Sequence, residues 1–514
     1  MKVDAKRVGS FPFYKSNPKE RVRNFSEVQL PYNEEDVKRE ADRCLLCGTP
    51  VCIDACPVLM DVRGMCEAVA RGDFKKAYER TRETNALLGV TARCCPQLQG
   101  LCEDACVLRW AGQPIAIGLI QRYIADWEKK NANQQPDPPK VNTSKPGKSI
   151  AVIGAGPAGL AGAELLCRYG HHVTIYEELP TSGGTAWYGV PDYHLPKDVL
   201  LYEIDRIQGM GVKIKTNLKV GKDITLSQLR EANDAVLIAT GSKDPVKLDT
   251  PGIDLAGIHD GYRFLEDVYV HGIDDFLKKH KIRMKNQESN EDTFNYDLGK
   301  KVMVVGGGDT ALDCARTALR LIGEGTVSIL YRRTENDMPA DPVMIEEAKE
   351  EGVQFRFLAQ PKSYEGVNGK VVAVNADSMQ LGEPDQSGRR KPQPIPGKEI
   401  RIECSAVLLA VGRGPNSFLQ HMHKNGSLET GKRNSIKINK QYKTSIEGVF
   451  ATGDVTTGET LVVKAMASGR EAAQRIHGYV MNQEDKHVSF YERYYKQNIY
   501  QRMLKGGKTG PPPQ

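Results

Sequence analysis

Nine of the twelve cysteines lie between positions 44 and 106, at spacings that suit an inorganic centre. A C-x2-C-x4-C-x3-C-P run comes first and consists of Cys44, Cys47, Cys52 and Cys56. A shorter group follows, in which one cysteine again stands directly before a proline: Cys95, Cys102 and Cys106. In two-cluster ferredoxin-type sites the cysteine before the proline ligates the other cluster. The pattern therefore indicates iron–sulfur chemistry, with zinc as the alternative because C-x2-C pairs serve zinc equally well.

A glycine-rich turn, Gly154-x-Gly156-x-x-Gly159, follows the apolar run SIAVI and opens a helical pattern. The first glycine permits a tight turn, the second lets a pyrophosphate approach the backbone, and the third allows close helix–strand packing. The phosphates then lie at a helix N-terminus, where free N–H groups and the dipole favour anions. Glu177 ends the next strand and is placed to accept hydrogen bonds from a ribose. We therefore predict a dinucleotide site; the alternative is a turn that only packs a helix.

A second turn, Gly306-x-Gly308-x-x-Ala311, has the same setting, and alanine is an accepted variant in the third place. The strand that follows ends in Arg332 and Arg333, where the first unit has an acid. An acid would repel a 2′-phosphate, whereas a guanidinium group can bind it with two parallel hydrogen bonds. This difference predicts NADPH rather than NADH; the alternative is that the arginines form a solvated strand end.

Asp454, in the run ATGDV, lies shortly before a helical pattern that starts near Thr460 and Leu461. Such an aspartate can accept a hydrogen bond from a ribitol hydroxyl, while the helix N-terminus faces an isoalloxazine; the alternative is an ordinary helix cap. A flavin-type fold beside the cysteines favours iron–sulfur over zinc, because zinc has no redox role. The sequence shows no nucleophile–base constellation, which fits hydride transfer by cofactors.

Two strand–turn–helix–strand units, residues 149–178 and 300–333, must position these motifs. The strand in GVFATGDV has to complete the first sheet, so the second nucleotide fold is predicted to be inserted into the first. The fold class is therefore α/β, with two Rossmann-like dinucleotide-binding domains preceded by an α-helical iron–sulfur domain. We predict these boundaries: 1–130 helical iron–sulfur domain, 131–148 linker, 149–256 first segment of the first dinucleotide-binding domain, 257–435 NADPH-binding domain, 436–485 second segment of the first dinucleotide-binding domain, 486–514 C-terminal extension with a disordered tail.

Bulk properties exclude several functional classes. The 514 residues suffice for roughly two to four domains. A net charge of +6 is too small for so long a chain to indicate nucleic acid or an anionic membrane. No apolar run is long enough to span a membrane, and the N-terminus lacks the apolar core of a signal peptide, so a cytoplasmic protein is expected. A non-catalytic scaffold is disfavoured by the intact phosphate-binding glycines.

Taken together, the motifs resemble those of the small (beta) subunit of NADPH-dependent glutamate synthase. The resemblance covers about residues 20–485 and rests on RCLLCGTPVCIDACP, CCPQLQGLCEDACVL, GLIQRY, AVIGAGPAGLA, SGGTAWYGVP, VVGGGDTALDCARTALR, YRRTENDMP and ATGDV. The same module looks like the N-terminal half of dihydropyrimidine dehydrogenase and the large subunit of ferredoxin-dependent NADPH transhydrogenase.

The resemblance implies two 4Fe-4S clusters with crossed ligation. One cluster would be held by Cys44, Cys47, Cys52 and Cys106. The other would be held by Cys56, Cys95, Cys102 and Gln121. FAD would lie in the first fold, against Gly154, Ala155, Gly156, Pro157, Gly159, Glu177, Gly184, Thr185, His194, Thr240, Gly241, Asp454 and Leu461. NADPH would lie in the second, against Gly306, Gly308, Asp309, Thr310, Ala311, Arg332 and Arg333.

The resemblance also implies an activity and a partner. NADPH would pass a hydride to FAD, and the clusters would carry electrons to a large subunit that makes glutamate from 2-oxoglutarate and glutamine. The alternative is a free-standing NADPH:ferredoxin or sulfide/polysulfide oxidoreductase built on the same module. Two departures from the family pattern concern the flavin: Thr185 and Ala186 replace apolar bulk, and His194 stands at a basic position.

Overall fold

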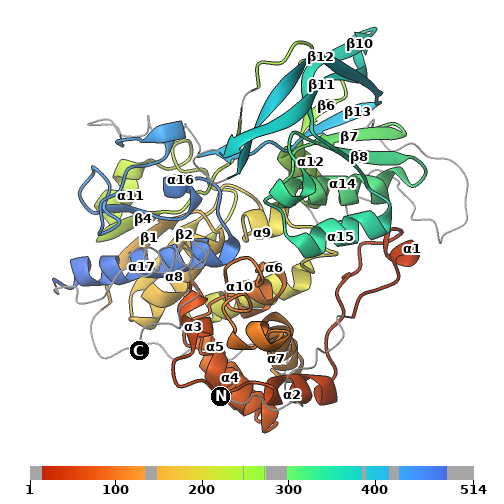
Figure 1. The fold of residues 1–514 in the computed structure, drawn as a ribbon. Helices are drawn as coiled ribbons and strands as arrows, with labels where there is room; N and C mark the ends of the chain where they lie inside the picture. Colours follow the sequence, from red (N-terminus) through yellow and green to blue (C-terminus); the bar gives the residue numbers. More distant parts are fainter. Residues whose placement is uncertain are drawn as a thin grey trace, which may run out of the picture.

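The computed structural model describes residues 14–132, 147–246, 248–270, 273, 298–384, 389–415 and 428–482. Most of the predicted linker and the predicted C-terminal extension lie outside these ranges. The described chain forms an N-terminal helical region and two sheet domains (Figure 1). No helix in these ranges is long and apolar enough to cross a membrane.

The N-terminal helical region is a cluster of short helices that begin at polar caps. Asp61 accepts a hydrogen bond from the Gly64 backbone N–H (2.9 Å), and Asp73 accepts one from Lys76 (3.1 Å). Such caps satisfy backbone donors that the first helical turn leaves unpaired. The main helices are α2 (Glu34–Asp42), α4 (Val62–Ala70), α5 (Phe74–Arg82), α6 (Leu88–Cys94) and α7 (Ile117–Asn131).

The first sheet domain has five parallel strands in the order β15-β4-β1-β2-β3. The strands are β1 (Ser149–Ile153), β2 (His172–Tyr176), β3 (Lys213–Lys215), β4 (Ala235–Ile238) and β15 (Val449–Ala451). Helices α8 (Pro157–Arg168) and α17 (Val462–Val480) pack against each other beside it. Because β15 comes from the end of the chain yet pairs with β4, the predicted insertion of one nucleotide fold into the other is confirmed.

The second sheet domain also has five parallel strands, in the order β6-β13-β7-β8-β9. These are β6 (Ile258–Asp260), β7 (Lys301–Val305), β8 (Thr326–Tyr331), β9 (Gln354–Phe357) and β13 (Ala406–Leu409). Its helices are α12 (Gly261–Tyr269), α14 (Asp309–Ile322) and α15 (Pro342–Glu351). The chain crosses between the two domains at β5 (Asp244–Pro245) and β14 (Arg413–Gly414), which pair antiparallel.

An antiparallel sheet that our sequence analysis did not predict rises from the second domain (Figure 1). It consists of β10 (Ala359–Val367), β11 (Lys370–Pro384) and β12 (Arg390–Glu403). A two-residue turn joins the first two strands, with φ of 52° at Asn368 and 77° at Gly369. Asn-Gly is a preferred pair for such turns, because both positions need positive φ.

The helical region and the first sheet domain share one continuous apolar core. Glu203, on α10 (Lys197–Gly209), joins them: one carboxylate oxygen pairs with Arg82 on α5 at 2.6 Å, and the other accepts the Gly89 N–H at 2.6 Å. Helix α6, which precedes Cys95, is thereby fixed against the domain that carries the first glycine turn.

The N-terminal strap, which we define as residues 14–30, runs from the helical region to α15 of the second sheet domain (Figure 1). Its short helix α1 (Pro18–Arg21) ends in Arg21, only 1% exposed, whose Nε donates to Glu351 Oε1 at 2.9 Å. Glu351 also accepts hydrogen bonds from Arg316 and Arg320 of α14. A buried ionic cluster thus fixes the N-terminal strap to α14 and α15 of the second sheet domain.

Candidate functional site

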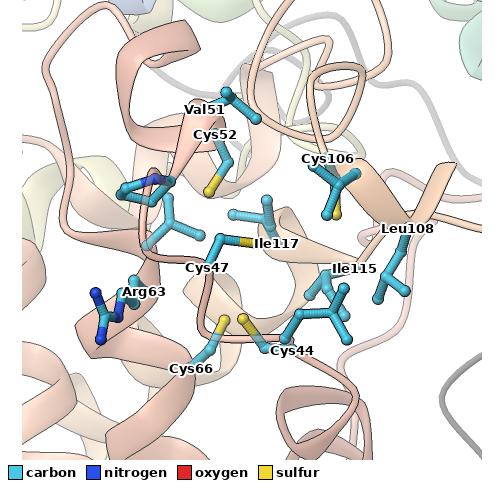
Figure 2. A pocket seen from close by; sticks show the side chains of 14 residues that line it. Cys44, Cys47, Val51, Cys52, Arg63, Cys66, Cys106, Leu108, Ile115 and Ile117 are labelled. Carbon is cyan, nitrogen blue, oxygen red and sulfur yellow. The ribbon is translucent and has the colours of Figure 1, made fainter. Parts of the chain in front are cut away.

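The first thiol pocket holds the four cysteines predicted for one cluster, with their sulfurs directed into a shared space (Figure 2). They come from the segment between α2 and α3 (Val51–Ala55), from α3 itself, and from the residue before the 3-10 helix η2 (Val107–Ala111). Apolar side chains, including Val51, Leu108 and Ile117, close the pocket around the sulfurs. A fifth cysteine, Cys66 on α4, lines the same pocket, and sequence analysis did not assign it there.

The thiols of this pocket perturb one another's ionisation. Burial raises the pKa of Cys52 to about 12, and the neighbouring Cys106, Cys44 and Cys47 add to the shift. All twelve cysteines are free of disulfides. Since iron binds the thiolate form, loading of the pocket releases protons. Free thiols, half-buried or buried, that converge from several segments fit a polynuclear cluster.

The second thiol group consists of Cys56, Cys95 and Cys102. Cys56 and Cys95 stand at the C-caps of α3 and α6. Burial raises the pKa of Cys102 well above its usual range, and Cys56 and Cys95 are among the groups that raise it further. The three side chains are thus close enough to act on one another, and Cys52 of the first thiol pocket also contributes to the shift of the Cys102 pKa. In the described ranges, no three His, Cys, Asp or Glu side chains are placed to hold a single metal ion.

Gln121, the predicted non-cysteine ligand, lies on α7 and is 5% exposed. Its Nε2 donates to the Leu88 carbonyl (2.9 Å) and to Thr91 Oγ1 (2.6 Å). The Thr91 carbonyl in turn accepts the Cys95 N–H at 3.1 Å, so Gln121 packs one helical turn before that cysteine. Both amide hydrogens are engaged, which leaves the Oε1 oxygen as the atom available to a metal. Its ligand role stays a prediction.

The first glycine turn is built as a cradle between β1 and α8. Gly154 has φ of 103°, and a Cβ there would lie 2.6 Å from the Ala239 carbonyl oxygen. At Gly159 a Cβ would lie 2.0 Å from the Gly154 carbonyl oxygen. Gly156 differs, because a Cβ there would meet only Gly184, at 3.9 Å. The backbone at Gly156 is thus open on the side where a pyrophosphate would pass, which fits a dinucleotide.

Glu177 closes this cradle from the end of β2. It is buried, and its two carboxylate oxygens accept backbone N–H groups of Ala155 (2.7 Å) and Leu179 (3.0 Å). Each oxygen keeps a further lone pair that a ribose hydroxyl can use. Burial raises the pKa of Glu177, while Lys243 lowers it. The turn that contains Gly184 folds onto the cradle.

Two polar residues lie just after β4 and β15, at the carboxyl edge of the sheet that also carries the first glycine turn. In the described ranges, Thr240 Oγ1 and Thr452 Oγ1 are buried and have no hydrogen-bond partner. Asp454 begins the short helix α16 (Asp454–Thr457), and its Oδ1 accepts the Thr460 N–H at 3.2 Å. Leu461 is the N-cap of α17. Unsatisfied buried hydroxyls are costly, so their presence fits a ligand with polar groups.

Other predicted flavin contacts differ in their surroundings. Thr185, at the start of the short helix α9 (Thr185–Tyr188), is exposed. His194 is half-buried, with Nε2 2.9 Å from the Arg93 carbonyl oxygen and Nδ1 unpartnered among the described residues. Burial lowers the pKa of His194 to about 4, so the ring is neutral at pH 7. The structure thus places His194 against α6, and its contact with flavin stays a prediction. Pro157 begins α8, and Gly241 follows Thr240 with positive φ.

The second glycine turn opens into a cleft of about 910 Å³ between β7, β8 and the crossing strands. Gly306, Gly308 and Thr310 line it, together with Arg332 and Arg333. Ala311 is buried in the core, and the Asp309 carboxylate accepts the Asp341 N–H at 2.9 Å. A Cβ at Gly308 would meet nothing within 4 Å, so the cleft is open at the helix N-terminus.

Cationic side chains gather around this cleft beyond the predicted pair. Arg389, Arg413, Lys432 and Arg433 also line it, and sequence analysis missed them because they come from distant loops. Arg413 pairs with Glu459 and lies 3.4 Å from the centre of the Tyr262 ring. The two predicted arginines differ in exposure. Arg332 is exposed, whereas Arg333 is buried and its Nε donates to the Arg390 carbonyl at 2.8 Å. A cleft of this charge suits a polyanionic nucleotide.

Comparison with known families agrees with this geometry. Residues 148–469 match a family model described as pyridine nucleotide-disulphide oxidoreductase. The chain belongs to that family. Residues 21–133 match a model described as dihydropyrimidine dehydrogenase domain II, 4Fe-4S cluster. The predictions of an oxidoreductase and of an N-terminal iron–sulfur domain are therefore confirmed.

Individual relatives extend this match. The small chain of NADPH glutamate synthase from Escherichia coli is 35% identical over 461 residues, which are 89% of this chain and 94% of that one. The NADP(+)-dependent formate dehydrogenase subunit beta of Moorella thermoacetica is 36% identical over 454 residues, 84% of this chain but 60% of that one. The solved structure of Mycobacterium tuberculosis FprA in complex with NADPH matches with a TM-score of 0.53 and 18% identity. The match covers 70% of this chain and 91% of that one. The resemblance to the glutamate synthase small subunit is thus confirmed.

Proposed function

We propose that this chain is the electron-input subunit of a glutamate synthase: it oxidises NADPH and delivers the electrons to a large subunit. The observation that carries the proposal is the presence, in one chain, of a cationic nucleotide cleft, a glycine cradle and two groups of free thiols. The match over 94% of the E. coli small chain supports it. FAD and 4Fe-4S clusters, when bound, supply hydride acceptance and one-electron transfer.

The protein's own residues bind the nucleotides and hold the thiol groups in place. The glycine turns and helix N-termini of α8 and α14 bind pyrophosphates, and the arginines of the cleft select the 2′-phosphate. Tyr262 and Arg413 stack on each other where the chain passes between the two sheet domains, and both line the cleft on the side of α16. The helical region shares its core with the first sheet domain, which holds the thiols at a fixed separation from the cradle.

Arg332→Ala tests the choice of NADPH. Because Arg332 is exposed and lines the cleft, its removal deletes a charge-assisted contact to the 2′-phosphate without opening the core. We expect kcat/KM for NADPH to fall roughly 10- to 100-fold, with kcat/KM for NADH unchanged. The control is Arg356→Ala, an exposed arginine on the next strand, β9. Equal losses for both nucleotides would contradict the assignment.

Asp454 predicts a pH dependence for FAD binding. Burial raises the pKa of Asp454 to about 7, with Glu459 adding to the shift. The carboxylate accepts a ribitol hydroxyl more strongly than the protonated acid does, so binding below pH 7 favours the release of a proton. We expect FAD affinity of the apoprotein to weaken by up to about tenfold for each pH unit below 7. Titrations at pH 5.5–8 measure this, and Asp454→Asn should flatten the slope; a flat wild-type profile would contradict the role.

The alternative is an NADPH oxidoreductase with another acceptor, such as ferredoxin or a sulfur compound. The formate dehydrogenase subunit of similar identity supports it, since that relative's name assigns a different partner. Anaerobic purification of the chain from its own cells, with co-eluting chains identified by mass, decides between the two. A stoichiometric large chain with a glutaminase domain supports glutamate synthase, whereas recovery alone or with a ferredoxin supports the alternative.

A further inference from the structure

The first thiol pocket contains one thiol more than a 4Fe-4S cluster needs. Four cysteines complete the predicted ligand set, yet Cys66 lines the same space. Its side chain comes from α4, a different element from the other four, and is 0% exposed. Figure 2 shows its sulfur directed toward that of Cys44, inside the pocket. Cys66 therefore lines the pocket while its helix face also belongs to the apolar core of the helical region.

Cys66 and Cys44 are in direct contact. The two thiols share a hydrogen bond. Cys52 and Cys106, both members of the predicted ligand set, also raise the pKa of the Cys66 thiol through their charges. Two sulfurs within hydrogen-bond reach of each other are both close to any iron that one of them binds. Cys66 lies on α4, which packs against α2, the helix that ends just before Cys44.

We propose that Cys66 is a reserve ligand of the cluster in the first thiol pocket and takes the place of Cys44. This inference rests on the proposed cluster. In the exchange the iron–sulfur bond to Cys44 breaks, a bond to Cys66 forms, and the Cys66 proton passes along the shared hydrogen bond to the Cys44 sulfur. No electron is gained or lost, and the pocket keeps four thiolates on the cluster in both arrangements.

Iron content of anaerobically reconstituted full-length variants tests the exchange. Cys44→Ala should retain the iron and sulfide of the wild-type protein, with an altered EPR spectrum after dithionite reduction, because Cys66 completes the ligand set. Cys47→Ala is the matched control: Cys66 makes its hydrogen bond to Cys44, so the loss of Cys47 should leave one cluster without a ligand. The double variant Cys44→Ala/Cys66→Ala should lose the same cluster, and Cys66→Ala alone should keep it.

The outcomes separate this inference from the proposed function. Loss of one cluster's iron from Cys44→Ala, equal to the loss from Cys47→Ala, overturns the reserve-ligand role while the cluster itself stands. A wild-type protein that takes up no iron and sulfide overturns the proposed cluster. Bound FAD, measured on each variant, reports that the chain is folded, so that low iron in a variant with full FAD reflects lost ligation.

Discussion

Replacement of Glu351 by alanine should destabilise the protein by about 3–5 kcal/mol, one of the largest effects we expect. The Glu351 side chain is 0% exposed and accepts hydrogen bonds from three arginines: Arg21, Arg316 and Arg320. Its removal leaves three buried guanidinium groups without their common counter-ion. Thermal unfolding of the full chain measures the loss as a lower Tm.

Glu346→Ala is the control, because Glu346 is 67% exposed and its ion pair with Lys15 spans 3.8 Å. Exposed pairs of this kind contribute at most about 1 kcal/mol. Equal Tm shifts for the two variants would contradict the structural role of the buried cluster.

The same cluster predicts how stability depends on pH. Burial by itself would raise the pKa of Glu351, but Arg320 and Arg316 outweigh it and hold the pKa well below its ordinary value of 4.5. A depressed folded-state pKa stabilises the protein above the unfolded-state pKa, and this contribution is lost as the pH falls. The Tm of wild type should therefore fall more steeply than that of Glu351→Ala below about pH 4.5.

Cys95→Ala should uncouple NADPH oxidation from electron delivery. Cys95 belongs to the second thiol group, with Cys56 and Cys102, and α6 holds it near Gln121. We expect the variant to lose one cluster's iron. Its NADPH-driven reduction of the partner should fall more than about 100-fold, since mutation of a residue that only hydrogen-bonds to a metal ligand already lowers metal affinity or activity about 10- to 100-fold. NADPH should still bleach the bound flavin, because the cleft and the cradle lie on other elements.

The adjacent Cys94→Ala is a matched control for that experiment. Burial raises the pKa of Cys94 to about 12, and the other groups that shift it most are Lys197, Asp313, Arg93 and Asp309, while Cys94 in turn raises the pKa of its neighbour Cys95. It should keep the full iron content and full electron delivery. Retention of all iron by Cys95→Ala, or loss of a cluster from Cys94→Ala, would contradict the ligand assignment.

Much of the architecture is predictable from sequence because its signals are local. Each glycine turn encodes its strand, turn and helix within one segment, and β1–α8 and β7–α14 follow that prediction. The insertion followed from a strand near the C-terminus that needed a sheet. The missed β10–β12 sheet did carry a local signal, the Asn368-Gly369 turn between alternating strands.

Other features were beyond sequence reasoning because they depend on contacts between distant segments. Arg21 and Glu351 meet across 330 positions, and neither has a motif. Cys66 joins the first thiol pocket only because α4 packs against α2, and Arg389 reaches the nucleotide cleft from the hairpin between β11 and β12. His194 was assigned by its neighbours in sequence, whereas its hydrogen bond is made to Arg93, 101 positions away.

The central claim is that NADPH electrons enter this chain at the cationic cleft and pass to a flavin in the glycine cradle. Anaerobic mixing of the FAD-loaded protein with NADPH, followed by flavin absorbance, tests it most directly. The account predicts rapid bleaching with NADPH and much slower bleaching with NADH, because the arginines of the cleft bind the 2′-phosphate. A flavin that stays oxidised in excess NADPH, or bleaches equally fast with NADH, would contradict it.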